Sequence, residues 1–410
     1  MKKITFLFVL ILHLHISFAQ NTKRVLFLGN SYTAYNNLPN LVSQMATNTG
    51  DTLIYDSNTP GGFRLMNHAS NTTTLNKINA DNWDFVTLQA QSQETSWSEA
   101  QMQIEVYPFA TELVNVIRQN NTCSQPLFYM TWGRENGDAQ NCEFAPWVCT
   151  YEGMDDAIRN TYTFMAQENT TEVAPVGAVW RYLRTHHPEV DLYTTDGSHP
   201  SVAGSYAAAC AFYTMIYKKD PSLITWNASL DNNIANTIRL AAKTIVFDEV
   251  NAWDFTANFN FTITNNEVTF SNTYAADTVL WDFNDGYTSS ENNPVHVYNT
   301  IGDFEVTLSI TACGRTHEIT KTVSISNLSI NNNTLSAIKI YPNPARDYII
   351  IQGKTNENAS ASLYTIFGQK VKHFETISAY PLSINNIASG TYILKISSGN
   401  SSHTTKLLKL

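Results

Sequence analysis

Short apolar runs alternate with longer amphipathic segments over the first 250 residues of the chain. Unbroken apolar runs are typical of strands buried on both faces of a parallel sheet, whereas apolar positions three and four apart indicate helices. The runs predict strands at residues 25–28, 53–55, 85–88, 127–130 and near 173. The amphipathic segments predict helices at residues 38–49, 102–119, 154–167, 179–185, 201–217 and 233–247. This alternation predicts a three-layer α/β domain around a parallel sheet.

The pattern changes after about Phe255, where helical periods end and short β-rich runs take over. Asn, Gly, Ser and Thr separate these runs, as expected for small β-sandwiches. Residues 281–286 predict a strand that enters a tight turn with its large aromatic side chains facing a core, and residues 294–298 and 302–308 continue the alternation. A polar linker at residues 327–333 separates this module from a second β-rich module at the end of the chain.

Both β-rich modules resemble known families. Residues 254–326 resemble a PKD domain through the motif WDFNDG at 281–286, in which Asn284 stands where that family commonly has Gly. Residues 334–410, with IYPNPA at 340–345, GTYILK at 390–395 and a basic end, resemble the C-terminal sorting domain of the type IX secretion system of Bacteroidetes. The second resemblance implies recognition by an outer-membrane exporter, followed by release or surface attachment. We expect the PKD-like module either to bind glycan or to act as a spacer.

Residues 1–19 have the pattern of a secretory signal peptide. A basic start at Lys2 and Lys3 precedes a short apolar run, and the small residues Ser17 and Ala19 occupy the expected cleavage positions. No later segment reaches the apolar length that crosses a bilayer, so we expect no transmembrane segment. The α/β domain would then span residues 20–253 of a protein that is secreted or held at the cell surface.

Composition narrows the possible partners and cofactors. The chain has 410 residues, a formal net charge of −10 and only 15% charged residues, which disfavours nucleic acid because phosphate binding needs clustered Lys and Arg. Of the five cysteines, Cys142 and Cys149 flank a loop and are the expected disulfide, while Cys210 lies in an apolar helical run and is expected to be buried. No spacing of Cys and His is typical of zinc, and we expect no metal and no cofactor.

A serine at the end of the first predicted strand is the strongest candidate for chemistry. Ser31 ends the motif GNS at 29–31, and Asp196 and His199 share one turn before a late helix. A serine hydroxyl becomes nucleophilic when an imidazole takes its proton and an acid holds the far nitrogen of that imidazole. Residues just past the carboxyl ends of parallel strands meet in one crevice. We therefore expect Ser31, His199 and Asp196 to meet.

These two motifs resemble the first and last conserved blocks of the SGNH (GDSL-like) hydrolases. The resemblance rests on GNSY at 29–32, after the first strand, and on Asp196-x-x-His199 near the end of the domain. It implies a flavodoxin-like fold and esterase or lipase activity, with Ser31 as nucleophile, His199 as general base and then acid, and Asp196 as the residue that orients the base. The Gly-x-Ser-x-Gly elbow of the α/β-hydrolases is absent from the chain.

The same resemblance implies an oxyanion hole with three donors. They are the backbone N–H of Ser31, a glycine N–H after the second strand and an asparagine side chain after the third. Gly62 is the expected glycine donor, with Gly61 as the alternative. The third block departs from the family, because Gln91 occupies the position of the asparagine and adds one methylene to the carboxamide. Gln89 is the alternative to Gln91.

Three tryptophans follow predicted strand ends and are expected at the rim of the crevice: Trp97, Trp132 and Trp147. Amphipathic rings in such loops can stack on the faces of sugars. We expect one or two of the three to contact substrate and the others to fill the core or brace a loop.

Together these features predict a secreted serine esterase that hydrolyses acyl esters, above all acetyl, on carbohydrate through an acyl-enzyme intermediate. Its partners would be an acylated carbohydrate or another small ester, and the outer-membrane secretion machinery. A lipase or thioesterase of the same fold is an alternative, although the sequence shows no long apolar lid or acyl channel. A non-catalytic adhesin that binds glycan is another alternative, which the altered third block favours and the intact Ser31, Asp196 and His199 oppose.

Overall fold

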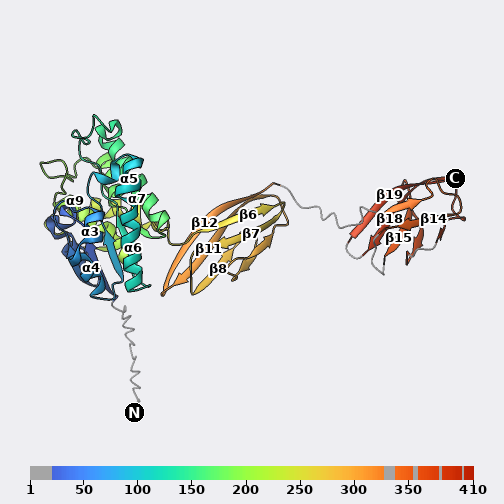
Figure 1. Cartoon of the computed structure of the whole chain (residues 1–410), viewed down its shortest axis with the longest axis horizontal. Helices are drawn as coiled ribbons and strands as arrows, with labels where there is room; N and C mark the ends of the chain where they lie inside the picture. The colour runs from blue at the N-terminus through green and yellow to red at the C-terminus, as the bar shows by residue number, and fades with distance from the viewer. Residues whose placement is uncertain (1–20, 327–337, 354–358, 378–380, 399–400) are drawn as a thin grey trace, which may run out of the picture. The chain divides into compact units, whose positions relative to one another are not determined.

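The computed structural model describes residues 21–326, 338–353, 359–377, 381–398 and 401–410. The expected signal peptide at residues 1–19 and the expected linker at 327–333 lie outside these ranges. The chain divides into two compact units, Met1–Ile325 and Ser326–Leu410 (Figure 1). The first unit holds the α/β domain and a β-sandwich, and the second unit is another β-sandwich. The predicted fold class is confirmed.

A five-stranded parallel sheet forms the centre of the α/β domain, in the order β2-β1-β3-β4-β5. The strand order matches the flavodoxin-like fold. β3 and β4 are buried along their whole length, because helices cover both faces of the sheet. The strands are β1 (Thr22–Leu28), β2 (Thr52–Asn58), β3 (Phe85–Leu88), β4 (Gln125–Tyr129) and β5 (Glu172–Ala174).

The two faces of the sheet have separate hydrophobic cores, and successive residues of β1 point into one and then the other. Val25 and Phe27 pack in the first core, whereas Leu26 and Leu28 pack in the second. The first core is covered by α2 (Leu38–Asn48), α8 (Val176–His186), α9 (Val202–Tyr217) and α10 (Asn232–Ala242). The second is covered by α3 (Leu65–Ser70), α4 (Thr72–Asn79), α5 (Glu99–Glu105), α6 (Tyr107–Asn120) and α7 (Tyr151–Glu168).

Two predicted helices are interrupted in the structure. The helix expected at residues 102–119 is two helices, α5 and α6, which meet at Val106. Pro108 lies in the first turn of α6, where its missing N–H is harmless, but the same ring would disrupt a continuous helix. The helix expected at 233–247 ends as a π-helical turn, Lys243–Phe247. The short helices α3 and α4 were not predicted.

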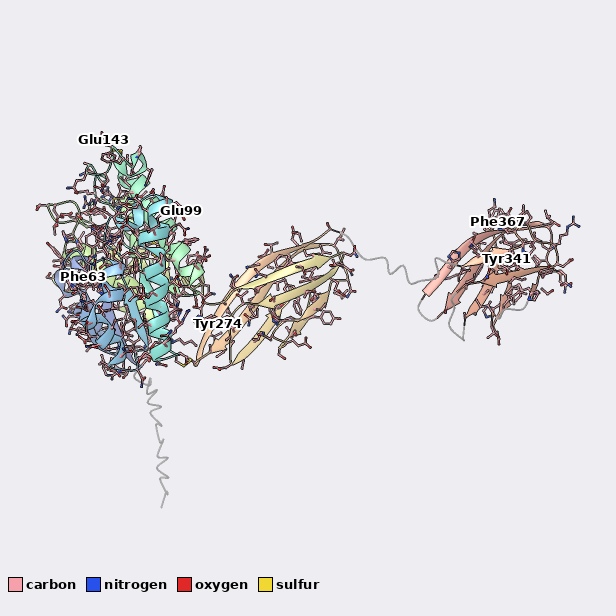
Figure 2. The ribbon with its side chains drawn as sticks, in the orientation of Figure 1. Phe63, Glu99, Glu143, Tyr274, Tyr341 and Phe367 are labelled. Atoms are coloured by element: carbon pink, nitrogen blue, oxygen red, sulfur yellow. A yellow bond between two sulfur atoms is a disulfide. The ribbon has the colours of Figure 1, made fainter. Side chains whose placement is uncertain are left out.

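The sandwich of the first unit is built from two antiparallel sheets. One contains β6 (Phe259–Thr264), β7 (Glu267–Asn272) and β10 (Val295–Val297). The other contains β8 (Thr278–Asp282), β9 (Thr288–Ser289), β11 (Gly302–Ala312) and β12 (Arg315–Ile325). Trp281 and Phe283 are buried between the sheets, as the motif at 281–286 predicts. Tyr274 lies where this sandwich meets the α/β domain (Figure 2).

A disulfide and an arginine join the sandwich to the α/β domain. Cys123, just before β4, is bonded to Cys313 in the turn between β11 and β12. The guanidinium of Arg315 donates to the carbonyl oxygens of Cys123 and Asp84, both at 3.0 Å. Asp84 immediately precedes β3. The sequence did not predict the bond between Cys123 and Cys313, whereas the expected disulfide between Cys142 and Cys149 is confirmed, as is the buried free thiol of Cys210.

A polar cluster of the buried residues Glu172, Asp254 and His317, with the exposed Lys218 at its edge, completes this junction at the start of β5. His317 Nδ1 lies 2.6 Å from Asp254 Oδ2, and Lys218 Nζ donates to Glu172 Oε2 at 2.9 Å. Burial raises the pKa of Asp254, but the hydrogen bond and charge of His317 outweigh that effect and lower it overall. The contacts of the junction therefore gather at the strands' N-terminal ends.

The second unit also consists of two antiparallel sheets around one core. The smaller sheet contains β13 (Lys339–Tyr341), β14 (Tyr348–Gln352) and β17 (Leu382–Ser383). The larger contains β15 (Ser360–Thr365), β16 (Lys370–Phe374), β18 (Gly390–Ser398) and β19 (Ser401–Lys409). Among the described residues of both units, no helix has the length and hydropathy to cross a membrane.

We expect the double substitution Cys123→Ser/Cys313→Ser to lower the melting temperature of the full chain. The bond joins residues 190 apart. Cross-linking so long a loop lowers the entropy of the unfolded chain and so stabilises the folded state by roughly 3 to 5 kcal/mol. Differential scanning calorimetry measures the shift. The matched control is Cys142→Ser/Cys149→Ser, whose bond spans a separation of 7 and should stabilise less. Equal melting temperatures for the two double variants would contradict the expectation.

Candidate active site

Ser31 stands at the carboxyl end of β1, in a turn that Asn30 shapes. β1 ends at Leu28, and Ser31 is the first residue of the short helix α1 (Ser31–Ala34). The side chain of Asn30 caps this helix by accepting a hydrogen bond from Tyr32 N–H at 3.1 Å. Ser31 is half-buried, and none of the described residues accepts a hydrogen bond from its backbone N–H. The turn therefore presents both a hydroxyl and a free donor at the end of the sheet.

The structure brings Ser31, His199 and Asp196 together in one hydrogen-bonded chain. His199 Nε2 lies 2.9 Å from Ser31 Oγ, and His199 Nδ1 lies 2.6 Å from Asp196 Oδ2. An ionised Asp196 can only accept, so Nδ1 carries the hydrogen and Nε2 is left to accept from the serine hydroxyl. This is the arrangement in which an imidazole can remove a proton from serine.

Asp196 is held ionised by its surroundings. Its Oδ1 atom accepts hydrogen bonds from the backbone N–H groups of Ser198 and His199, both at 2.9 Å, and from the hydroxyl of Thr194 at 2.8 Å. Burial acts to raise the pKa of Asp196, but the hydrogen bonds, first that of the His199 side chain, outweigh it and hold the pKa below its ordinary range. Asp196 can therefore orient His199 and balance a positive charge on it.

A tight loop between α8 and α9 carries Asp196 and His199. Thr194 N–H donates to His199 O at 2.9 Å and Gly197 N–H donates to Thr194 O at 3.0 Å, which closes the loop on itself. Gly197 has a φ of +64°, in the left-handed region that favours glycine. Its carbonyl accepts from Glu135 N–H at 2.8 Å, so the loop is also tied to the segment that follows β4.

The loop after β2 brings Gly61 and Gly62 next to the serine turn. Phe63 O accepts a hydrogen bond from Asn30 Nδ2 at 3.0 Å, and Asn30 directly precedes Ser31. Gly62 has a φ of +73°, and a Cβ atom added to either glycine would meet nothing within 4 Å. None of the described residues accepts from the backbone N–H of Gly61 or Gly62. Both glycines therefore keep an open, unused donor.

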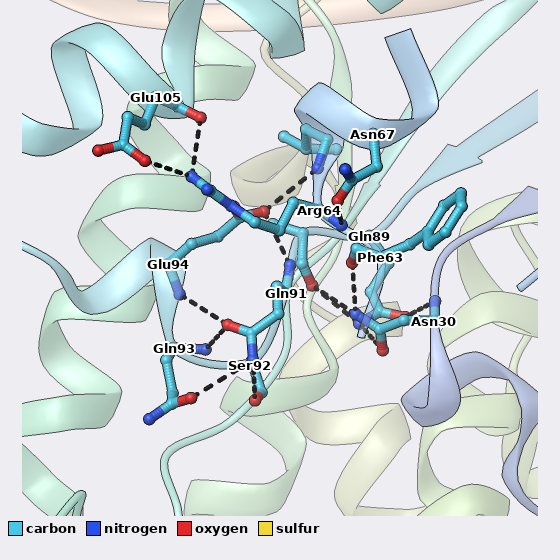
Figure 3. Close-up of polar contacts among 12 residues, drawn as sticks. Asn30, Phe63, Arg64, Asn67, Gln89, Gln91, Ser92, Gln93, Glu94 and Glu105 are labelled. Carbon is cyan, nitrogen blue, oxygen red and sulfur yellow. Dashed lines mark hydrogen bonds and ion pairs between the residues drawn. The ribbon is translucent and has the colours of Figure 1, made fainter. Parts of the chain in front are cut away.

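The side-chain oxygen and nitrogen of Gln91 contact different groups (Figure 3). Its Oε1 atom accepts from the backbone N–H of Gln93 at 2.7 Å and of Glu94 at 3.2 Å, at the start of the short 3₁₀ helix Glu94–Ser96. Its Nε2 atom has only long contacts, to Ser92 Oγ at 3.2 Å and to Gln93 Oε1 at 3.4 Å. The carbonyl end is fixed, and the amide end keeps donor capacity.

The structure does not support Gln89 as the alternative oxyanion donor, because both hydrogens of its side-chain amide are used in hydrogen bonds within the protein. Gln89 is fully buried, and its Nε2 atom donates to Asn30 Oδ1 at 2.7 Å and to Ala90 O at 2.8 Å. Its Oε1 atom accepts from Asn30 N–H at 3.0 Å and Thr33 Oγ1 at 2.7 Å. Gln89 instead holds the turn that presents Ser31.

An ion pair that the sequence did not reveal fastens the glycine loop to the Gln91 loop. Arg64 Nε donates to Glu94 Oε2 at 2.7 Å, and Glu94 Oε1 accepts from Gln91 N–H at 2.8 Å (Figure 3). The Glu94 side chain is fully buried, and burial raises its pKa despite the opposing effect of Arg64. The same guanidinium reaches Glu105 Oε2 at 2.9 Å.

The three expected rim tryptophans have different positions. Trp132 is fully buried, so its expected place on the rim is wrong: it stacks on Tyr32 and Trp180, and its indole N–H donates to Ser198 O at 3.1 Å. Trp97 is half-buried beneath the guanidinium of Arg64. Trp147 is 42% exposed. A strand-end position alone does not show whether a side chain turns toward solvent or core.

Comparisons with known families identify the two β-rich parts of the chain. Residues 250–326 match the PKD domain, and residues 339–409 match the secretion system C-terminal sorting domain. The chain carries both domains. The sorting domain indicates export to the cell surface or the medium. A microbial collagenase from Vibrio alginolyticus is 43% identical over 75 residues, which are 17% of this chain and 9% of the collagenase. The chain thus spans only a small part of that relative.

Several solved structures are similar to the N-terminal half of the chain. A DUF4886 family protein from Bacteroides uniformis is 20% identical and covers 56% of this chain and 95% of its own, with a TM-score of 0.47. A candidate SGNH hydrolase from Slackia heliotrinireducens is 24% identical and covers 47% of this chain and 98% of its own, with a TM-score of 0.40. A carbohydrate esterase family 3 protein from Talaromyces cellulolyticus is 16% identical over 48% of this chain and 97% of its own, with a TM-score of 0.35.

We expect Arg64→Leu to destabilise the protein by about 3 to 5 kcal/mol at neutral pH, because it leaves a buried carboxylate at Glu94 without its partner. The raised pKa of Glu94 would rise further. A carboxyl whose pKa is raised in the folded state contributes stability at low pH, and this contribution disappears as pH rises. The loss of folding free energy in Arg64→Leu should therefore be smallest at about pH 4 and grow toward about pH 8.

Urea unfolding at several pH values measures this loss. The matched control is Lys77→Leu, which breaks a pair with Asp56 whose side chains are 29% and 44% exposed. That change should alter the free energy of unfolding by less than about 1 kcal/mol at every pH. A pH-independent loss in Arg64→Leu would show that Glu94 is not the group left unpaired.

Proposed function

We propose that the α/β domain, taken as residues 20–253, is a serine esterase of the SGNH type that acts outside the cell. The observation that carries the proposal is the chain from Ser31 Oγ through His199 to Asp196, with both contacts at hydrogen-bond distance. The sorting domain supports export, and we propose that the outer-membrane type IX machinery recognises it. The PKD domain, taken as residues 254–326, and the tail, taken as 334–410, would contribute placement rather than chemistry.

The reaction would proceed in two acyl-transfer steps. Ser31 Oγ attacks the ester carbonyl while His199 Nε2 takes the hydroxyl proton, and Asp196 balances the charge of the imidazolium. Collapse of the tetrahedral intermediate breaks the bond to the leaving alcohol, which receives the proton from His199. Water then attacks the acyl-serine, His199 removes its proton, and the acid leaves as Ser31 regains its hydrogen. Each proton taken by the base is returned, so the enzyme is restored.

Three donors would stabilise the oxyanion of both intermediates: the N–H of Ser31, the N–H of Gly62 and the Nε2 atom of Gln91. The first two make no hydrogen bond to a described residue, and the third has only long contacts. Donors that are oriented before the reaction and aimed at developing charge are often the largest catalytic contribution of an acyl-transfer enzyme. Gly61 remains the alternative to Gly62.

The substrate that we propose is an acyl ester, in particular an acetyl ester, on carbohydrate. Trp147 and Phe144 are 42% and 81% exposed on the loop closed by the disulfide between Cys142 and Cys149. Trp147 N–H donates to Ser96 O at 2.8 Å, which holds its loop against the segment that follows β3. An exposed aromatic pair on a braced loop suits stacking on sugar rings.

We expect Ser31→Ala to lower kcat/KM for p-nitrophenyl acetate at least about a thousandfold, because the nucleophile is lost. Asp196→Asn should lower kcat by a similar factor, since an amide can present a donor to Nδ1 and favour the wrong tautomer. Ser43→Ala on α2 is the matched control and should be as active as wild type. An unchanged rate in Ser31→Ala would overturn the mechanism. Acetate release from a panel of acetylated polysaccharides then tests the substrate.

Two replacements of Gln91 test the third donor. Gln91→Glu keeps an acceptor for the N–H groups of Gln93 and Glu94 but loses the amide donor, and Gln91→Leu removes both without adding charge. We expect each to lower kcat about a hundredfold with little change in KM. The control is Gln119→Glu, a change of the same chemical kind at an exposed glutamine on α6. If Gln91→Leu keeps wild-type kcat, Gln91 is not an oxyanion donor.

A further inference from the structure

Two tyrosines from the segment that carries Ser31 contact the imidazole ring of His199 in different orientations. The ring of Tyr35 stacks on the imidazole, with centroids 4.4 Å apart and planes 18° apart. The ring of Tyr32 meets it nearly at a right angle, with centroids 5.4 Å apart and planes 74° apart. The hydrogen bonds that His199 makes to Ser31 and Asp196 involve neither tyrosine ring. The two ring contacts therefore need a separate explanation.

The imidazole needs more support than its hydrogen bonds supply. On the acid side it is held by one bond, to a carboxylate whose side chain is 47% exposed. One hydrogen bond leaves the ring free to tilt about the line that joins Nδ1 to the carboxylate, and tilting would carry Nε2 away from Ser31 Oγ. The face of Tyr35 and the edge contact with Tyr32 block this motion.

Tyr32 is itself held in place by a stack of aromatic rings. It is 2% exposed and lies parallel to Trp132, with centroids 4.7 Å apart, and Trp132 lies parallel to Trp180, with centroids 3.7 Å apart. Its hydroxyl lies 2.7 Å from Ser198 Oγ, while Trp132 N–H donates to Ser198 O. Burial raises the pKa of Tyr32 further above its ordinary value. Tyr32 and Trp132 therefore also hold Ser198, the residue just before His199.

We infer that Tyr35 and Tyr32 are positioning residues for the proposed reaction, which hold the imidazole of His199 with Nε2 aimed at Ser31. The inference rests on the proposed esterase function. Tyr35 has a second effect, because the face of an aromatic ring attracts the positive charge that forms when His199 takes the serine proton. Residues 31–35 thus supply both the proposed nucleophile and the two rings.

The experiment measures kcat and KM of the full chain on p-nitrophenyl acetate for a small set of variants. Tyr35→Leu keeps an apolar side chain but removes the ring, and we expect kcat to fall about tenfold with KM unchanged. Tyr35→Phe keeps the stack and should stay within about twofold of wild type. Tyr32→Phe removes the contact with Ser198 Oγ and should lower kcat about threefold to tenfold. Tyr287→Leu, at a tyrosine 62% exposed on the PKD domain, is the unchanged control.

Other outcomes would overturn the inference. A rise in KM at constant kcat in Tyr35→Leu would make Tyr35 a substrate-binding surface instead. Equal losses in Tyr35→Phe and Tyr35→Leu would assign the effect to the hydroxyl and contradict the stacking role. Wild-type kinetics in Tyr35→Leu and Tyr32→Phe, together with an inactive Ser31→Ala, would refute the positioning role and leave the esterase proposal standing.

A measurement that needs no activity separates the inference from the proposed function. If wild type is no more active than Ser31→Ala, the esterase proposal fails. NMR of histidine-labelled full chain then decides whether the rings hold the base, with the His199 ring signal assigned by its loss in His199→Asn. We expect Tyr35→Leu to shift that signal, because a stacked aromatic ring changes the local magnetic field, and Tyr287→Leu to leave it unchanged. An unmoved signal in Tyr35→Leu would refute the contact.

Discussion

The hydrogen bonds of one buried side chain, Asn30, join the three loops on which the site depends. Its Oδ1 atom accepts from Tyr32 N–H in the serine turn and from Gln89 Nε2 after β3, and its Nδ2 atom donates to Phe63 O after β2. An unsatisfied amide at this depth would carry a large desolvation penalty, so these partners define one arrangement of the loops. Gly29 belongs to the same arrangement, because a Cβ there would lie 2.5 Å from Gln89 Oε1.

The proposed base, His199, needs a different kind of support, because it comes from a loop far along the chain. Ser31 and His199 are 168 residues apart, and only Asp196 and the loop's own hydrogen bonds act locally on the imidazole. Aromatic stacking supplies the long-range part: Trp180 on α8 and Trp132 after β4 carry the contact from the core to the serine turn. Amide hydrogen bonds therefore hold the turn of Ser31, whereas aromatic rings pack against His199.

How far the sequence predicts this arrangement depends on how local each signal is. Apolar runs identify the strands because burial on both faces favours apolar residues, and the short spacing of Asp196 and His199 confines both to one turn. The choice between Gln89 and Gln91 turns on the exact end of β3, and only the contacts of the structure decide it. Arg64 and Glu94 pair across loops that lie 30 residues apart, where no periodicity operates.

The place of the PKD domain also follows from strand direction. Ser31, Gly62 and Gln91 lie past the carboxyl ends of β1, β2 and β3, whereas the disulfide at Cys123 and the contacts of Arg315 lie at strand starts. In a parallel sheet these two edges are opposite, so the domain is fastened away from the crevice. A glycan bound there would be held at a distance from the proposed site. The two expected roles of this domain, glycan binding and spacing, would therefore act through placement, whereas all residues of the proposed site belong to the α/β domain.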